Sequence, residues 1–341
     1  MTDPLGRLTP PVRVAPAKLN LTLAVLGRRR DGFHDLHSVM VPLGLGDRLS
    51  FAPTPAGGDG GAHDTLHVDG FDPGPPEENL VLRAIAAART AVGAGWPGGP
   101  GPAPALAVRL DKRIPVAAGL AGGSSDGAAA LDGALEAWGA ELDPDRRAAI
   151  AARLGSDVPF FLAGGPALVE GRGERVTPLG GLRGRPGVLL VTPALAISTA
   201  AAFAVFAALG GRGNGSVRLS SEHLAGELGT GLSTTDLVAR AGVLAAANDL
   251  LPAAAAVAPG LIAFRRALFR VLRRPVGLTG SGPTLWALYP SEDEAAGAAD
   301  VVRGALADGA LHPPGSGAPN VVATTIVSGP PDDQPDGRTA R

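Results

Sequence analysis

Apolar positions along the chain follow two periods, and segments of the two kinds are mixed. Alternating or continuous apolar runs predict strands over residues 12–14, 20–26, 36–43, 105–110, 166–170, 187–191, 284–289 and 320–327. Helical spacing predicts helices over residues 78–92, 126–140, 144–154, 219–228, 235–244, 261–273 and 291–306. Since the two kinds of element do not alternate strictly as β-α-β, the sequence predicts an α+β fold.

Length and composition narrow the class of protein. A chain of 341 residues is long for one domain, and two lobes that share a cleft are expected. The net charge of −2 provides no electrostatic basis for binding nucleic acid or an acidic membrane. The absence of cysteine excludes disulfides and thiolate chemistry, and residues 1–14 contain no apolar signal-peptide core. The expectation is a soluble, cytoplasmic protein.

The most informative segment is the glycine loop, residues 115–125, which reads Pro-Val-Ala-Ala-Gly-Leu-Ala-Gly-Gly-Ser-Ser. It lies between a predicted strand and a predicted helix, where backbone N–H groups and the helix dipole favour an anion such as phosphate. It matches neither the Walker A nor the dinucleotide-binding pattern. In a chain with 50 glycines the loop could also be background, so its composition alone leaves both interpretations open.

Lysine is almost absent from the chain. Of the 30 basic residues only Lys18 and Lys112 are lysines, and Lys112 stands just before the glycine loop. A compact ammonium differs from a planar guanidinium in size and donor geometry. The two lysines are therefore candidates for positions that arginine does not fit, although compositional drift would also leave a few.

Four further segments complete a recognisable set. They are Lys-Leu-Asn at 18–20, Asp-Gly-Phe-His at 31–34, Gly-Ser-Asp-Val-Pro-Phe-Phe at 155–161 and Leu-Thr-Gly-Ser-Gly-Pro-Thr at 278–284. With the glycine loop, this set resembles the GHMP kinases over about residues 12–290. The resemblance implies a two-lobed α+β fold with a central cleft. The N-terminal lobe is expected over residues 1–165, the C-terminal lobe over 166–328, and a disordered tail over 329–341.

The branch of the family that the chain resembles implies a specific reaction. The expected activity is ATP-dependent phosphorylation of the 2-hydroxyl of 4-diphosphocytidyl-2-C-methyl-D-erythritol, in non-mevalonate isoprenoid biosynthesis. Another GHMP small-molecule kinase, such as homoserine kinase, is the alternative enzyme. The alternative that is not an enzyme is a nucleotide-binding regulator with the same fold. Such a protein would be expected to lack Asp157 or Lys18.

The resemblance assigns catalysis to Asp157 and Lys18. Asp157 would accept the proton of the acceptor hydroxyl, and Lys18 beside it would keep the carboxylate ionised and polarise that hydroxyl. Asn20 would orient the same group as a substrate-binding residue. Without the resemblance, Asp157 would more commonly cap a turn, Lys18 would be a surface lysine and Asn20 a turn amide.

The resemblance also implies the binding residues. His34 would read the cytosine ring between Phe33 and Phe203, although a Phe-His pair is more often core packing. ATP would be bound by Asn79, Leu80, Lys112, Pro115, Gly119, Leu120, Ala121, Gly122, Gly123, Ser124 and Ser125. Mg²⁺ is expected on the ATP phosphates, and its protein ligands are unknown from the sequence. The partner is a small-molecule cytidylyl alcohol, with no nucleic acid or membrane, and the protein is expected to be a monomer or weak homodimer.

Overall fold

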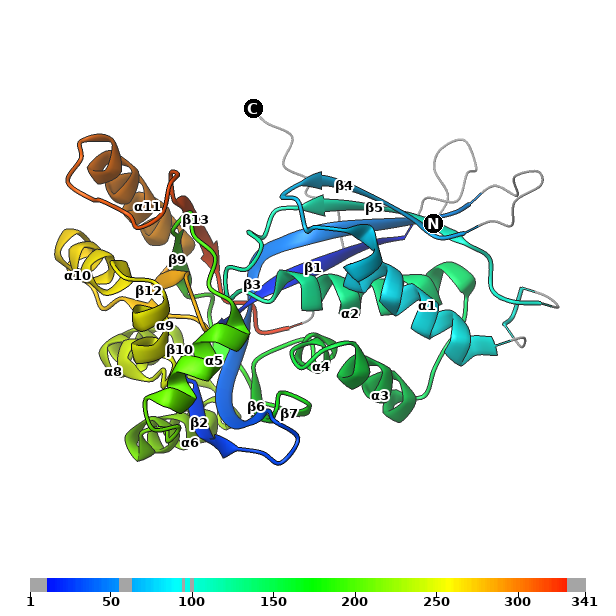
Figure 1. Cartoon of the computed structure of the whole chain (residues 1–341), viewed down its shortest axis with the longest axis horizontal. Coiled ribbons are helices and arrows are strands. Elements are labelled where there is room, and N and C mark those ends of the chain that lie inside the picture. Colours follow the sequence, from blue (N-terminus) through cyan, green and yellow to red (C-terminus); the bar gives the residue numbers. More distant parts are fainter. Residues whose placement is uncertain (1–10, 55–62, 94–95, 99–100, 330–341) are drawn as a thin grey trace.

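Two sheets, each covered by helices, form the two lobes in Figure 1. The computed structural model describes residues 11–54, 63–93, 96–98 and 101–329. Within those ranges no helix is both long enough and apolar enough to cross a membrane. All of the tail expected over 329–341 except residue 329 lies outside the described residues.

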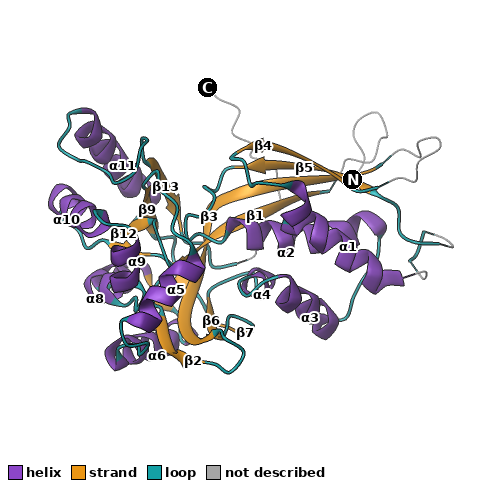
Figure 2. Ribbon diagram, in the orientation of Figure 1, coloured by secondary structure: helices purple, strands orange, loops and turns teal. Residues whose placement is uncertain are grey.

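The first lobe is built on a seven-stranded sheet with β3 at its centre. Its strands are β1 Val12–Asn20, β2 Ala24–Arg28, β3 His34–Pro53, β4 Thr65–Gly70, β5 Leu106–Lys112, β6 Ala167–Gly171 and β7 Arg175–Pro178. Helices pack below this sheet in Figure 2, and they are α1 Leu80–Val92, α2 Gly122–Trp138, α3 Pro144–Leu154 and α4 Val158–Leu162, with a 3₁₀ turn at Pro76–Glu78. The sheet therefore continues to Pro178, beyond the lobe boundary expected at residue 165.

The second lobe has a four-stranded sheet in the order β11-β12-β9-β13. Its strands are β9 Gly187–Thr192, β11 Gly277–Leu278, β12 Leu285–Tyr289 and β13 Asn320–Thr325, and a small parallel pair is formed by β8 Leu182–Arg183 and β10 Leu232–Ser233. The helices are α5 Thr199–Ala208, α6 Gly215–Gly229, α7 Thr234–Ala239, α8 Ala241–Ala246, α9 Leu251–Val257, α10 Leu261–Leu272 and α11 Glu292–Ala307.

Apolar side chains fill three main cores. One lies between the first sheet and its helices and includes Phe51, Ile85 and Trp138. A second spans the lobes, because side chains of β1 and β3 pack with Trp286 of the second sheet. The third lies inside the second lobe around Phe264. Since one core is shared, the lobes hold the cleft between them in a defined geometry.

Helix starts follow local side-chain signals. The carboxylate of Asp143 accepts a hydrogen bond from the Arg146 N–H at 2.9 Å, and α3 begins at Pro144 as expected. The Ser291 hydroxyl likewise accepts from the Glu294 N–H at 3.2 Å, so α11 begins where the capping box predicts.

Several expected boundaries are wrong, three of them as follows. β1 is one strand that passes through Pro16 with a register shift before Lys18; it pairs only with β3 among the described strands, and proline is tolerated at such an edge or bulge. β3 runs past the expected end at residue 43, because Gly46 allows close approach of β1: a Cβ there would lie 3.0 Å from the Ala15 carbonyl oxygen. The helix expected over 235–244 is two short helices, α7 and α8.

Candidate active site

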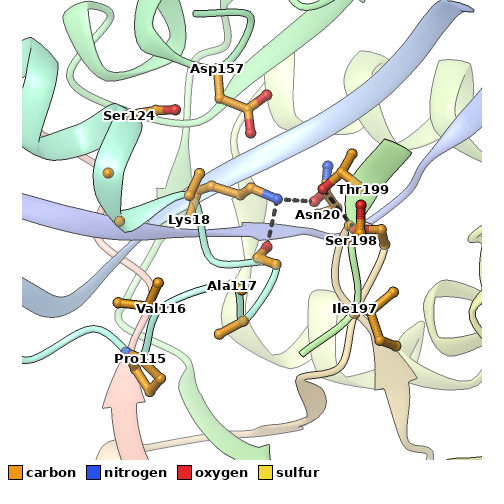
Figure 3. Close-up of a pocket in the computed structure, with 18 of the residues that line it drawn as sticks. Lys18, Asn20, Pro115, Val116, Ala117, Ser124, Asp157, Ile197, Ser198 and Thr199 are labelled. Atoms are coloured by element: carbon orange, nitrogen blue, oxygen red, sulfur yellow. Dashed lines mark hydrogen bonds between the residues drawn. The ribbon is translucent and has the colours of Figure 1, made fainter. Parts of the chain in front are cut away.

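A cavity of about 520 Å³ is lined from both lobes. The N-terminal lobe contributes the end of β1, the glycine loop, the start of α2 and Asp157. The C-terminal lobe contributes the start of α5 and the turn Gly280–Gly282. Figure 3 shows Lys18, Asn20 and Asp157 around the same open space, with Ser124 on one side and Thr199 on the other.

The glycine loop wraps around the entrance to α2 in an unusual backbone conformation. Ala117 and Ala121 both have φ of 54°, and Gly119 has φ of 78°. A Cβ on Gly119 would lie 2.6 Å from the Thr279 carbonyl oxygen, so only glycine lets the two lobes meet here. A Cβ on Gly123 would meet nothing within 4 Å, which leaves the first turn of α2 accessible. Free N–H groups at that turn suit a phosphate.

Lys18 is held in the cavity wall by its own hydrogen bonds. Its Nζ donates to Asn20 Oδ1 at 2.5 Å and to the Gly119 carbonyl oxygen at 2.7 Å, and the residue is 3% exposed. Burial lowers the pKa of Lys18, and the charge of Asp157 opposes that shift. The ammonium is therefore fixed beside a carboxylate, and Lys18 is not a surface lysine.

Asn20 is buried in β1, and its side chain holds the Lys18 ammonium in place. Its Nδ2 donates to Ser38 Oγ at 2.8 Å, which leaves Oδ1 turned toward the ammonium. Its backbone N–H donates to the Thr279 hydroxyl at 3.1 Å, across the lobe boundary. The amide is thus part of a buried network within the sheet, not a turn residue.

Asp157 lies directly before α4, but its side chain makes no capping hydrogen bond to that helix. The carboxylate points toward Lys18 in Figure 3 and lines the cavity. A carboxylate that faces an ammonium in a cavity, without a structural hydrogen bond to its own helix, is available for proton transfer.

A turn of the C-terminal lobe closes the cavity behind Lys18. Asn248 Nδ2 donates to the carbonyl oxygens of Leu278 and Gly280, both at 2.9 Å. A Cβ on Gly280, whose φ is 57°, would lie 3.2 Å from Lys18 Nζ. The turn therefore packs directly on the ammonium, and Asn248 holds the turn in place.

Lys112 forms a second buried charge cluster, at the other side of the glycine loop. Its Nζ contacts Asp47 and lies 2.9 Å from Asp126 Oδ2. Asp47 Oδ1 also accepts the backbone N–H groups of Arg113 at 2.6 Å and Ile114 at 2.8 Å. All three charged side chains are at most 3% exposed. Burial raises the pKa of Asp126 to about 8, although the charge of Lys112 opposes the shift.

Comparisons with known proteins agree with this geometry. Residues 79–165 match the family model for the GHMP kinases N terminal domain. A 4-diphosphocytidyl-2-C-methyl-D-erythritol kinase of Pelotomaculum thermopropionicum is 38% identical, over 81% of this chain and 88% of its own length. One of Synechococcus sp. (strain CC9311) is also 38% identical, over 88% of this chain and 94% of its own length.

The chain belongs to the family of 4-diphosphocytidyl-2-C-methyl-D-erythritol kinases.

Solved structures extend the comparison. A crystal structure of 4-(cytidine 5'-diphospho)-2C-methyl-D-erythritol kinase superposes with a TM-score of 0.67 and 30% identity, covering 93% of this chain and all of that one. A homoserine kinase from Cytophaga hutchinsonii has the same fold, with a TM-score of 0.62 at 16% identity. The two-lobed GHMP kinase fold expected from the sequence is therefore confirmed, and the chain is an ATP-dependent small-molecule kinase.

Most of the predicted ATP-binding residues of this family member line the cavity. They are Asn79, Leu80, Lys112, Pro115, Gly119, Ala121, Gly122, Gly123 and Ser124. Leu120 and Ser125 differ: the Leu120 side chain is buried in the shared core, and Ser125 is buried with its hydroxyl unpartnered among the described atoms. On a helical first turn successive side chains point in different directions, so Ser124 faces the cavity and Ser125 does not.

The predicted cytosine-binding residues are only partly together. The Phe203 ring stacks on His34, with centroids 4.8 Å apart, and Phe203 lines the cavity. Phe33 is 48% exposed and packs under Arg172, whose Cζ lies 5.3 Å from the ring centroid. Phe33, which precedes β3, is not among the residues that line the cavity. The sandwich of a cytosine ring between them stays a prediction.

His34 is not among the residues that line the cavity, although Phe203, on which it stacks, is one of them. The Nε2 of His34 is buried and has no partner among the described residues, and Phe206 packs edge-on at 6.0 Å. Burial lowers the pKa of His34, with a further contribution from the charge of Arg28. A neutral imidazole has one donor and one acceptor, which suits the edge of a base.

Sequence reasoning missed several residues of this site. Asp47 and Asp126 were not singled out, although a search for partners of the rare Lys112 would have favoured acidic residues. Ser198 and Thr199 line the cavity at the start of α5, within the otherwise apolar run of residues 194–209. Asn248 lies in a segment, Asn248-Asp249-Leu250, that resembles a family segment near the substrate cleft, but the sequence does not indicate that its amide binds the turn after Leu278.

Asp126→Asn is expected to remove a pH dependence of stability. The folded protein keeps a proton on Asp126 up to pH about 8, whereas the unfolded chain releases it near the usual value of 3.8. The folded state binds more protons in this window, so the free energy of unfolding falls as pH rises through it, by up to about 1.4 kcal/mol per unit. Urea unfolding from pH 5 to pH 9 should give a shallower slope for the variant than for the wild type; parallel curves would contradict the assignment.

Proposed function

We propose that the protein transfers the γ-phosphoryl group of ATP to the 2-hydroxyl of 4-diphosphocytidyl-2-C-methyl-D-erythritol, giving the 2-phosphate and ADP. The step belongs to non-mevalonate isoprenoid biosynthesis. One observation carries the proposal: Lys18 and Asp157, 139 positions apart, face each other in the cavity that the glycine loop lines. Relatives with this activity in their names match most of the chain.

The arrangement supports an in-line transfer. Asp157 accepts the proton of the acceptor hydroxyl while the hydroxyl oxygen bonds to the γ-phosphorus, and the bond to the β–γ bridging oxygen breaks to release ADP. Lys18 supplies positive charge where negative charge develops, and its hydrogen bonds to Asn20 and Gly119 fix that charge before the reaction. Fixed geometry of this kind lowers the entropic cost of bringing two substrates together.

The two substrates are expected to bind on different sides of Lys18. Asn79, Leu80 and Lys112 line the cavity from α1 and β5, which suits the nucleotide. Leu36 at the start of β3 and Phe203 in α5, which stacks on His34, also line it, and they suit the cytidylyl group. The acceptor and the nucleotide would then meet at Lys18 and Asp157.

Mg²⁺ is proposed to enter with ATP. In the described ranges no group of three or more His, Asp or Glu side chains could hold a metal ion. The open first turn of α2 at Gly123 fits the phosphates that would carry it, and the ion would neutralise phosphate charge.

We further propose a cytoplasmic enzyme that is a monomer or weak homodimer and acts on small molecules, with no nucleic acid or membrane partner, in keeping with its net charge of −2.

A coupled ADP-release assay with a panel of acceptors tests the proposed function. The cytidylyl alcohol should give turnover dependent on Mg²⁺, whereas homoserine and mevalonate should give rates near background. Equal or faster turnover of homoserine would favour the alternative GHMP kinase. Release of ADP without any acceptor dependence would refute phosphoryl transfer to an alcohol.

His34→Ala is expected to raise the KM for the cytidylyl alcohol by about 10- to 100-fold, because the base would lose its hydrogen bonds in a buried site. The KM for ATP should change less than threefold. His37→Ala is the matched control, since His37 lies on the same strand but its Nδ1 already has a partner, the Ser221 hydroxyl at 2.9 Å. Equal effects of His34→Ala on both substrates would remove His34 from the cytidylyl site.

A further inference from the structure

The cluster around Lys112 is asymmetric. Lys112 and Asp126 line the cavity, whereas Asp47 is fully buried behind them and lines no part of it. The three residues come from three elements, since Asp47 lies in β3, Lys112 at the end of β5 and Asp126 in the first turns of α2. No chemistry of the proposed reaction accounts for a carboxylate at Asp47.

The hydrogen bonds of the cluster indicate which of its two carboxyl groups is ionised. One ammonium faces two carboxylates, and a low-dielectric site disfavours two ionised acids beside one cation. Asp47 accepts two backbone N–H groups in addition to the ammonium, whereas Asp126 Oδ1 has no partner among the described residues. Asp47 is therefore the ionised partner of Lys112, and Asp126 is the neutral one.

The same contacts determine where the ammonium lies. A Cβ on Gly122 would lie 2.8 Å from Lys112 Nζ, so the ammonium packs directly against the first turn of α2. The two N–H groups that Asp47 binds belong to Arg113 and Ile114, which lead from β5 into Pro115 and the glycine loop. One carboxylate thus fixes both the cation and the start of the loop.

We propose that Asp47 is a positioning residue for nucleotide binding, which acts by fixing Lys112 beneath the first turn of α2 and by anchoring the entrance to the glycine loop. The inference rests on the proposed function only in that a nucleoside triphosphate occupies this side of the cavity. Asp47 touches neither substrate, and its effect should appear in the affinity for ATP rather than in the rate of transfer.

Asp47→Asn is expected to weaken ATP binding about 10- to 30-fold, because the ammonium loses its ionised partner and can shift toward Asp126. Isothermal titration with ATP and with ADP gives the Kd directly. In steady-state kinetics the KM for ATP should rise by the same factor, while kcat at saturating ATP and the KM for the alcohol change less than twofold. A fall in kcat with unchanged ATP affinity would overturn the proposal.

A double-variant cycle tests whether Asp47 acts through Lys112. Lys112→Met should weaken ATP binding at least as much as Asp47→Asn, and the double variant should be no weaker than Lys112→Met. Multiplying effects would mean that Asp47 acts independently of Lys112, against the proposal. The double variant carries no unpaired buried ammonium, so its comparison with Lys112→Met remains measurable even if Asp47→Asn alone does not fold.

Asp64→Asn is the matched control. Asp64 accepts the Leu106 N–H at 2.9 Å and pairs with Arg89, so it anchors the other end of β5 in the same way but outside the cavity lining. It should lower thermal stability without changing the Kd for ATP. If Asp64→Asn weakens ATP binding as much as Asp47→Asn, the effect is general loosening of β5 and the proposal fails.

The titrations also separate this inference from the proposed function. They need no acceptor, so a weakened Kd in Asp47→Asn would support the positioning role even if the cytidylyl alcohol is not phosphorylated. Conversely, turnover of that alcohol with an unchanged Kd for ATP in Asp47→Asn would keep the proposed function and refute the inference.

Discussion

Asp157→Asn is expected to lower kcat about a thousand-fold and to leave the Kd for ATP within a factor of three. An amide at this position cannot accept the hydroxyl proton, and the loss falls within the range typical of a general base. The side chain makes no capping bond to α4, so the substitution should cost little stability. Single-turnover kinetics and titration with ATP measure the two effects separately.

Asp143→Asn is the matched control for that variant. Asp143 also stands directly before a helix with proline among its first two residues, but its carboxylate caps α3 and does not line the cavity. The control should keep nearly wild-type turnover, because asparagine is also a good N-cap. Turnover of Asp157→Asn within tenfold of the wild type would mean that another group accepts the proton.

Lys18→Arg is expected to lower kcat by about a hundred-fold or more, although the charge is retained. The ammonium lies 2.7 Å from the Gly119 carbonyl oxygen, and the turn at Gly280 packs against it, so a planar guanidinium does not fit the same space. Moving the charge by about an ångström is enough to lose most of its effect on the transition state. Steady-state kinetics with both substrates, and titration with ATP, measure the loss.

The other lysine of the chain is the natural comparison. Lys112→Arg should raise the KM for ATP and leave kcat at saturating ATP within a few-fold, because Lys112 lies under the start of α2, on the nucleotide side. A Lys18→Arg variant with retained kcat would show that any cation serves at that position. Identical kinetic defects in both variants would argue against separate roles for the two lysines.

Much of the local structure could be predicted because its causes are local. α3 begins after Asp143 and α11 after Ser291, because each of these side chains accepts a hydrogen bond from the backbone N–H three residues later. The strand β12 is a buried apolar run and was predicted within one residue. The structure begins α2 at Gly122, four residues before the predicted start, because glycine is a poor helix former and the sequence does not show that a Cβ there would lie 2.8 Å from Lys112 Nζ.

Candidate residues of the site were visible in the sequence for a different reason. Phosphoryl transfer needs a base, a cation and a phosphate loop, and few residue types provide them. Asp157 and Lys18 stood out within motifs, and the scarcity of lysine singled out Lys112. Asp47 carried no such signal, because one aspartate at the middle of a strand looks like any other until β5 and α2 pack against it.

By itself, the amino-acid sequence determined the family, the order of most elements and the residue types that the chemistry needs. These depend on short patterns, which a few neighbouring residues define. Only the tertiary structure decided which distant residues form ion pairs and hydrogen bonds with one another. Lys112 meets Asp47 across 65 positions, and Asn20 meets Thr279 across 259. Burial removes water from such pairs, so their protonation and position depend on the folded neighbours and not on the adjacent sequence.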